Sequence, residues 1–184
     1  MSRFCFLLLF LCYSSGIFAL PSAEDTTTLD LAALPASTDM RAYIYSLEEK
    51  NHQPYSPAEA RQQDFTANAR LFHNGKQNNK RARAFWLKLS VRNTGAMDSS
   101  LTFFSGWHDY MYWYVAKPHG PLSLVSKAGL MLDKGDVERW EHYGFPVQVP
   151  AGETRIFYLH IVNKSFNENT LMPVLYNALQ FERF

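Results

Sequence analysis

The sequence predicts an all-β protein, a β-sandwich of jelly-roll type with one short helix. Residues 84–92 alternate the apolar Phe85, Leu87, Leu89 and Val91 with other side chains, a period that places successive residues on opposite faces of a strand. Further short apolar stretches follow at regular spacing and are separated by turns rich in Gly and Pro. The composition of 14 Phe, 10 Tyr and 4 Trp also favours sheets over a helical bundle. Because one sheet cannot cover its own apolar face, we expect a second sheet against the first.

Residues 84–92 form the expected central strand. Its apolar face is predicted to be buried, while Lys88, Ser90 and Arg92 are predicted to face solvent. The following Asn93-Thr94-Gly95 suits a tight reversal of the chain. We therefore expect residues 99–104 to fold back on this strand as an antiparallel hairpin.

The other expected strands cover residues 42–47, 109–115, 122–126, 145–150, 155–162 and 174–176. The strand at 145–150 is flanked by prolines, which favours the edge of a sheet. The strand at 155–162 has a continuous apolar character, which indicates burial on both faces. Before the central strand, Ser56 and Pro57 are typical of a helix start, so we expect a short helix to about Asp64.

The first nineteen residues have the three parts of a secretory signal. A positive start at residues 1–3 precedes an apolar run at 4–13 and a small-residue exit that ends at Ala19, the expected cleavage point. An uncleaved anchor is the alternative, although the run is shorter than the roughly 20 residues that a membrane-spanning helix needs. Both cysteines, Cys5 and Cys12, lie in this segment, so we expect no disulfide in the mature chain.

The rest of the chain is expected to form one domain with short flanking segments. Residues 20–39 are rich in Pro, Ser, Thr and Ala and are interpreted as a linker or a loosely tethered first strand. Residues 40–178 are the expected β-sandwich, and residues 179–184 the expected C-terminal tail.

The charge balance argues against nucleic acid as a partner. Lys plus Arg is 18 and Asp plus Glu is 17, without a long run of either sign, so we expect no binding to nucleic acid or to an anionic membrane surface. The short basic run at residues 80–83 is interpreted as a solvated loop in preference to a polyanion site.

No motif in the sequence points to catalysis, a cofactor or a metal. The six histidines have no zinc-type spacing, and no Gly-x-Ser-x-Gly turn or glycine-rich phosphate loop is present. A cluster of acids lacks a complete calcium-loop pattern, so a solvated loop is favoured over calcium for Asp133, Asp136, Glu138 and Glu141. Paired carboxylates of glycosidase type stay open, because their separation is spatial.

Aromatic and polar side chains form the candidate ligand site. Sugars stack their CH faces on rings, and their hydroxyl groups need donors and acceptors. Arg139 has a fixed fork of donors that suits a carboxylate or vicinal hydroxyls, although an ion pair with Asp136 or Glu141 is equally open. The alternative for Trp107, Trp113 and most tyrosines is burial in the core. The candidate ligand-binding residues are Trp107, His108, Tyr110, Tyr112, Arg139, Trp140 and His142.

Four segments together resemble a known family: residues 85–93, the aromatic strand at 109–115, Arg139 and residues 145–159. Over approximately residues 29–176, the chain resembles the second type of extracellular sensor domain in bacterial seven-transmembrane receptors with diverse intracellular signalling modules. The resemblance implies a periplasmic jelly roll, galactose-binding-like in architecture, that senses a carbohydrate or another small ligand without catalysis.

Two features depart from the family pattern. Asn78-Asn79-Lys80-Arg81 occupies the place where the family usually has an Asn-aromatic-Gly element. The family domain also leads into seven apolar helices and an output module, whereas this sequence reaches Phe184 with no further run of membrane-spanning length. We therefore expect membrane contact only through a C-terminal region that this sequence lacks or through an uncleaved signal, and a fragment and a free-standing domain both stay open. A periplasmic structural or protein-interaction domain and, less favoured, a glycoside hydrolase are the alternative functions.

Overall fold

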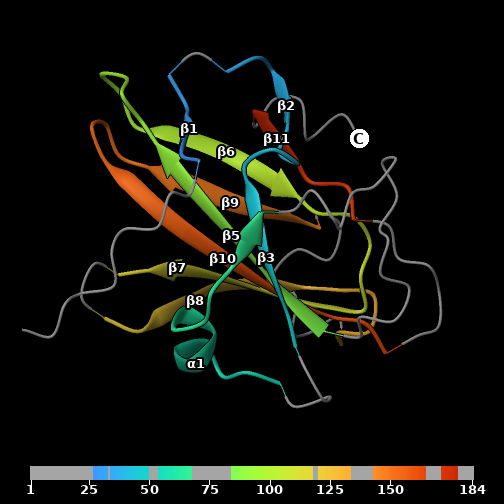
Figure 1. Ribbon diagram of the computed structural model, residues 1–184. Coiled ribbons are helices and arrows are strands. Elements are labelled where there is room, and N and C mark those ends of the chain that lie inside the picture. The colour runs from blue at the N-terminus through green and yellow to red at the C-terminus, as the bar shows by residue number, and fades with distance from the viewer. Residues whose placement is uncertain are drawn as a thin grey trace, which may run out of the picture.

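The computed structural model describes residues 27–32, 34–49, 54–67, 84–117, 120–133, 143–164 and 171–177. These residues form eleven strands and one short helix, arranged in two packed sheets (Figure 1). The predicted all-β sandwich with one short helix is confirmed. The predicted signal segment at 1–19 and the tail at 179–184 lie outside the described residues.

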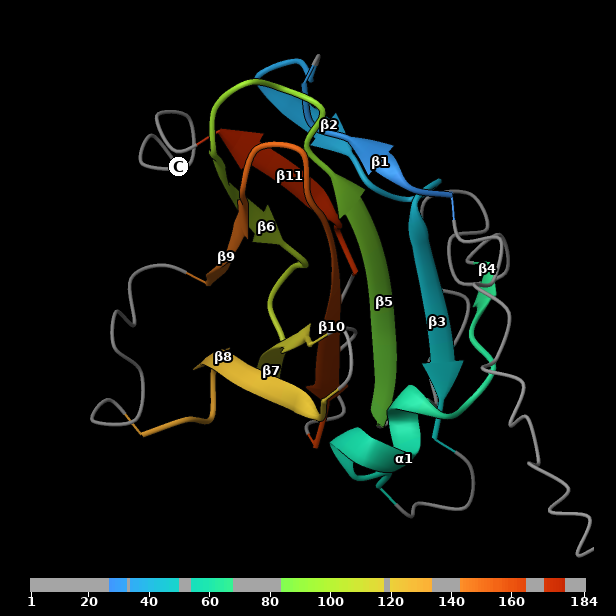
Figure 2. The ribbon, with the colours of Figure 1, turned by 90° about the vertical axis from the view of Figure 1, so that its left-hand side faces the viewer.

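The larger sheet has seven strands in the order β4-β3-β5-β10-β7-β8, and β1 pairs in parallel with the end of β5. Figure 2 shows β3, β5 and β10 side by side, with the helix α1 near one end of β5. The strands are β1 (Leu29–Asp30), β3 (Ile44–Glu48), β4 (Thr66–Ala67), β5 (Ala84–Arg92), β7 (Tyr110–Ala116), β8 (Leu122–Ala128) and β10 (Thr154–Val162).

The smaller sheet has four strands in the order β2-β11-β6-β9. They are β2 (Ser37–Asp39), β6 (Ser99–Phe104), β9 (Gly144–Val149) and β11 (Val174–Asn177). The strand with the prolines, β9, lies at the edge of this sheet as predicted. Both β1 and β2 fall within residues 20–39, the segment expected to be a linker or a loosely tethered first strand. Residues 29–30 and 37–39 of that segment are strands.

The expected hairpin between β5 and β6 is wrong, because the two strands lie in different sheets. One edge of β5 is paired with β10 along its whole length, and the other is paired with β3 and β1. The Asn93 side chain joins the sheets instead, since its Nδ2 donates to Met97 O at 2.8 Å and to Val149 O at 3.0 Å. The residues that suit a reversal therefore carry the chain across the sandwich.

The core between the sheets is aromatic. Trp113 of β7 stacks on three rings at centroid distances between 5.1 and 5.4 Å, and its Nε1 donates to Pro146 O of β9 at 2.9 Å. Five consecutive residues of β10, from Phe157 to Ile161, are buried, which confirms the predicted burial on both faces. The three stacked partners of Trp113 are Phe103, Phe145 and Phe157.

The outer face of the larger sheet is also covered, which corrects the expected wet face of β5. Trp86 and Ser90 are buried there, while Lys88 is partly exposed and Arg92 is exposed. A second apolar cluster forms on this face from Ala60, Phe65, Trp86, Leu122 and Tyr158. The helix α1 (Pro57–Arg61) begins at the predicted proline, is closed by a capping box between Ser56 and Glu59, and ends earlier than predicted.

Candidate functional site

Trp107 lies on the connection between β6 and β7, residues 105–109, which carries the chain from the smaller sheet to the larger one. Gly106 precedes it with φ of 106°, in the left-handed region that favours glycine, and allows the sharp change of direction. The residues around the indole turn inward, since Ser105, His108 and Asp109 are buried. Trp107 is 52% exposed.

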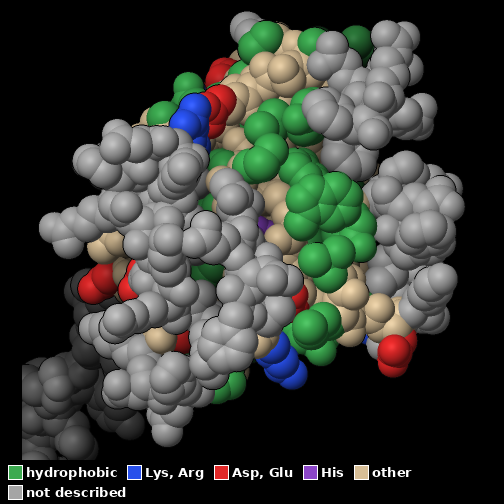
Figure 3. Space-filling view, turned by 90° about the vertical axis from the view of Figure 1, so that its right-hand side faces the viewer, with side chains coloured by type: hydrophobic (Ala, Val, Ile, Leu, Met, Phe, Trp, Pro, Cys, Tyr) green, Lys and Arg blue, Asp and Glu red, His purple; other side chains and the backbone are tan. Residues whose placement is uncertain are grey.

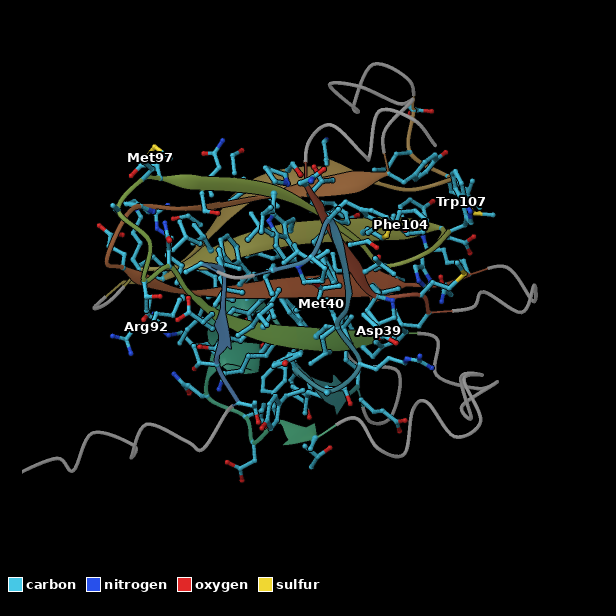
Figure 4. All side chains as sticks on the ribbon, turned by 90° about the horizontal axis from the view of Figure 1, so that it is seen from above. Asp39, Met40, Arg92, Met97, Phe104 and Trp107 are labelled. Carbon is cyan, nitrogen blue, oxygen red and sulfur yellow. The ribbon has the colours of Figure 1, made fainter. Side chains whose placement is uncertain are left out.

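Two aromatic rings fix the orientation of the Trp107 indole. Phe104 meets it edge-on at 5.9 Å between centroids, and Tyr143 meets it at 4.4 Å with an interplanar angle of 66°. Figure 4 shows Phe104 and Trp107 together at one end of the molecule, opposite Met97. Edge-on contacts of this kind restrain a ring and leave its remaining surface open to solvent.

Three exposed apolar side chains belong to segments bonded to the same connection. Leu130 N and Met131 N donate to His108 O and Asp109 O at 2.9 and 3.0 Å, and Met172 N donates to Ser105 O at 2.8 Å. Each of the three side chains is about half exposed. Figure 3 shows a gathering of hydrophobic side chains on one face of the molecule. We call Trp107, Tyr143, Leu130, Met131 and Met172 the Trp107 surface.

His108 lies beneath this surface and is fully buried. Its Nε2 donates to Ser105 O at 3.3 Å, and its Nδ1 accepts from Asn163 Nδ2 at 3.3 Å. Burial lowers the pKa of His108 to about 4, although its hydrogen bonds and the nearby Asp109 act in the opposite direction. A ligand in solution has no access to this imidazole, so the candidate site excludes His108.

Tyr110 and Tyr112 lie on the outer face of the larger sheet, opposite the inward Met111 and Trp113. Lys164 Nζ lies 4.8 Å from the centroid of the Tyr110 ring, and the Tyr112 ring lies 6.0 Å from that of His160. Both tyrosines are partly buried. In the described residues, no ring contact joins either of them to Trp107, so the sequence candidates divide between two places.

The remaining sequence candidates, Arg139, Trp140 and His142, lie outside the described residues. Their ligand-binding role stays a prediction. Three of the four clustered acids, Asp136, Glu138 and Glu141, lie in the same segment, while Asp133 is described and exposed. Within the described ranges, no three His, Cys, Asp or Glu side chains come close enough together to hold a metal ion.

A buried polar cluster on the outer face of the larger sheet was not predicted from the sequence. Glu49 Oε1 accepts from Trp86 Nε1 at 2.8 Å and from Tyr55 N at 3.0 Å, and it lies 3.0 Å from His160 Nε2. The Glu49 side chain is only 3% exposed. The Trp86 and His160 rings are parallel, 4.3 Å apart. Burial raises the pKa of Glu49, but His160 and the two N–H donors outweigh it and hold that pKa below its ordinary value.

The sequence signals for this cluster were weak. Glu49 follows the strand expected at 42–47 in a polar stretch, and Trp86 lies on the face of β5 that was expected to be wet. The alternation along β5 and β10 does place Trp86 and His160 on one face, and the two residues are register partners in adjacent strands. A polar residue inside the apolar run of β10 was the one available sign of a buried pair.

No curated protein matches the chain. Protein SO0799 from Shewanella oneidensis, a crystal structure, is similar over 55% of this chain and 66% of its own length, with 15% identity and a TM-score of 0.18, a likeness that carries no argument. In the part of the chain that the structure describes, no helix has the length and apolar character to cross a membrane.

A family model matches residues 41–172, which is most of the chain and spans the strands from β3 to β10. It is described as 7TMR-DISM extracellular 2, and its members are extracellular sensor domains of seven-transmembrane receptors. The match confirms the resemblance found in the sequence and the expected extracytoplasmic location. This chain therefore belongs to the 7TMR-DISM extracellular 2 family.

Proposed function

We propose that this sensing domain binds a carbohydrate or another small ligand with an apolar face, without catalysis, and that the Trp107 surface is its binding site. One observation carries the proposal: the Trp107 indole is half exposed while two rings hold it in place. A restrained aromatic ring loses little conformational freedom when a ligand stacks on it, so more of the contact energy appears as affinity.

The polar residues that precede Tyr143 in the sequence are of the kind that hydroxyl groups require. Arg139 and His142 belong to the segment that leads directly to Tyr143, whose ring contacts Trp107. We propose that Arg139, Trp140 and His142 complete the site, with the guanidinium group donating to ligand oxygens.

The two buried acids of the described residues support a non-catalytic role. Glu49 is engaged by Trp86, Tyr55 and His160, and Asp109 Oδ2 accepts from Lys164 N at 2.6 Å. Glycoside hydrolysis requires two carboxyl groups that face each other across a cleft open to the substrate. Neither buried acid meets that requirement.

A second candidate function is recognition of a partner protein at the same surface. Leu130, Met131 and Met172 are exposed and purely apolar, and Met is common at adaptable protein-binding surfaces. A sugar site would have more hydrogen-bonding groups among its exposed residues, so these three side chains are what favours the partner-protein alternative.

The test is a thermal-shift screen of the chain against mono- and oligosaccharides and other small polar metabolites. Ligand binding to the folded state raises Tm by mass action, and we expect Trp107→Ala and Arg139→Ala each to remove the shift. Met97→Ala is the matched control, because Met97 is 81% exposed and lies at the other end of the molecule (Figure 4). A shift that survives Trp107→Ala would place binding elsewhere. A screen without any hit, together with capture of a defined periplasmic protein that Trp107→Ala abolishes, would favour the second candidate.

A further inference from the structure

A chain of hydrogen bonds beneath Trp107 fixes the protonation state of His108. Ser105 O is a carbonyl oxygen and can only accept a hydrogen bond. His108 Nε2 lies 3.3 Å from it and must therefore carry the proton. His108 Nδ1 is then the unprotonated nitrogen, and it accepts from Asn163 Nδ2 at 3.3 Å. The imidazole is therefore held neutral, with its proton on Nε2.

The Asn163 side chain cannot rotate to accommodate a second proton without losing a bond. Its Oδ1 accepts from Asp109 N at 3.3 Å, while its Nδ2 donates to His108. A proton on His108 Nδ1 would place two donors against each other. A flip of the amide would present Oδ1 to His108 but would leave the buried N–H of Asp109 facing the amide NH₂.

The same bonds act on the turn that carries Trp107, together with the backbone bonds from Met172 N to Ser105 O and from Leu130 N to His108 O. Ser105 and His108 flank the Gly106-Trp107 pair, and His108 ties both ends of this short turn to Asn163 at the end of β10. The indole therefore projects from a turn whose two ends are both fastened through one imidazole.

We propose that His108 and Asn163 are positioning residues that hold Trp107 in its exposed orientation, and that acid releases Trp107 by protonating His108. This pH response would regulate ligand binding at the Trp107 surface, so its biological role rests on the function proposed above. An extracytoplasmic domain is exposed to the pH of its surroundings, so binding at Trp107 would weaken in acid.

The other groups around His108 do not reverse this prediction. Asp109 is the charged neighbour and favours protonation, but its Oδ2 is held by Lys164 N, and burial of His108 outweighs it. The Lys164 ammonium group lies over the Tyr110 ring. From β5 the imidazole meets the Phe85 ring edge-on at 6.2 Å, and from the segment after β8 Leu130 N donates to the backbone oxygen of His108 at 2.9 Å. In the described residues, Asp109 is the charged side chain that acts on the imidazole.

The test follows the protein by NMR during a pH titration and needs no ligand. The His108 ring carbons report protonation, and the Trp107 indole N–H reports its environment. We expect both signals to change with one midpoint, about pH 4. Asn163→Asp places a carboxylate against Nδ1 and should raise the His108 midpoint by about one to three units. The carboxylate accepts the new proton, so the two donors no longer meet, and the Trp107 signal should stay unchanged as His108 is protonated.

Two further variants control the result. Gln148→Glu adds the same charge at an exposed position of β9 and should leave both midpoints unchanged. His108→Gln should remove the pH response of the Trp107 signal. A midpoint for His108 near 6.5 in the unmodified chain, or a Trp107 signal that does not follow His108 there, would overturn the inference. A Trp107 signal that still follows His108 in Asn163→Asp would also overturn it. Because no ligand is used, a failed ligand screen leaves this result intact.

Discussion

The indole of Trp113 in the larger sheet donates a hydrogen bond to Pro146 O in the edge strand of the smaller sheet, at 2.9 Å. This bond crosses the core of the sandwich, where the Trp113 ring stacks on Phe103, Phe145 and Phe157. Loss of the indole N–H would leave the Pro146 carbonyl without this partner.

Trp113→Phe should therefore lower the free energy of unfolding by about 2 kcal/mol, from the lost bond and the smaller ring. Urea unfolding followed by circular dichroism measures the change. The same substitution at the exposed Trp107 should cost less than about 0.5 kcal/mol. Equal costs at the two positions would contradict the structure.

Gly129→Ala should destabilise the domain strongly. A Cβ at Gly129, where φ is +147°, would lie 2.3 Å from Asp109 O and 2.8 Å from Tyr110 Cα, which are backbone atoms of the connection that carries Trp107. We expect a loss of about 3 kcal/mol or more in urea unfolding.

Gly152→Ala provides the matched control. Gly152 also has a positive φ, of +74°, but a Cβ there meets nothing within 4 Å. Its cost should be about 1 kcal/mol, the backbone term alone. A Gly129→Ala protein as stable as Gly152→Ala would show that the connection is not packed against Gly129.

Glu49→Ala should cost about 3 kcal/mol, because it leaves Trp86 Nε1 and Tyr55 N without their buried acceptor and removes the carboxylate beside His160. Glu49→Gln keeps an oxygen acceptor and should cost less. The exposed pair of Glu153 with Arg155, at 3.3 Å, is the control: Glu153→Ala should change stability by less than about 1 kcal/mol. Denaturant unfolding at pH 7 measures the loss of stability in each variant. A Glu49→Ala protein that loses no more stability than Glu49→Gln or Glu153→Ala would contradict the buried cluster.

Stability should fall in acid from about pH 6.5 downward. The pKa of His108 is lowered from 6.5 to about 4 in the folded state, so its stabilising contribution is complete above pH 6.5 and is lost as pH falls toward 4. The difference corresponds to about 3 kcal/mol. The lowered pKa of Glu49 adds a further loss below about 4.5.

Urea unfolding between pH 7.5 and 4 measures this loss. His108→Gln should flatten the part of the profile between pH 6.5 and 4.5, where Glu49 is still ionised. An unmodified domain whose stability is constant over that range would show that His108 is not buried in its neutral form.

Much of the fold was predictable from the sequence because alternation and turn residues act locally. The positions of β5, β6 and β10 and the edge placement of β9 followed from those signals. The partner of each strand did not. Asn93 has the chemistry of a tight turn, yet its side chain bridges Met97 and Val149 across the two sheets, a contact between distant segments that local pattern does not encode.

The candidate site was predictable in part, for a similar reason. The sequence identified Trp107 as a candidate, but it grouped His108 with it although the two neighbours face opposite environments. The connection at 105–109 is irregular, so the period that separates inward and outward residues in a strand gives no guidance there. The contacts of Glu49 with Trp86 and His160 join three separate segments, which local pattern does not bring together. His160, a polar residue inside the apolar strand β10, was the one sequence sign of this buried cluster.

The most direct test of the account is an NMR titration with a carbohydrate or small-molecule hit while the indole N–H signals are followed. The account predicts that the Trp107 signal moves with ligand concentration, that the buried Trp86 and Trp113 signals stay in place, and that Trp107→Ala abolishes binding. A ligand that binds with unchanged affinity to Trp107→Ala, or that leaves the Trp107 signal unmoved, would contradict it.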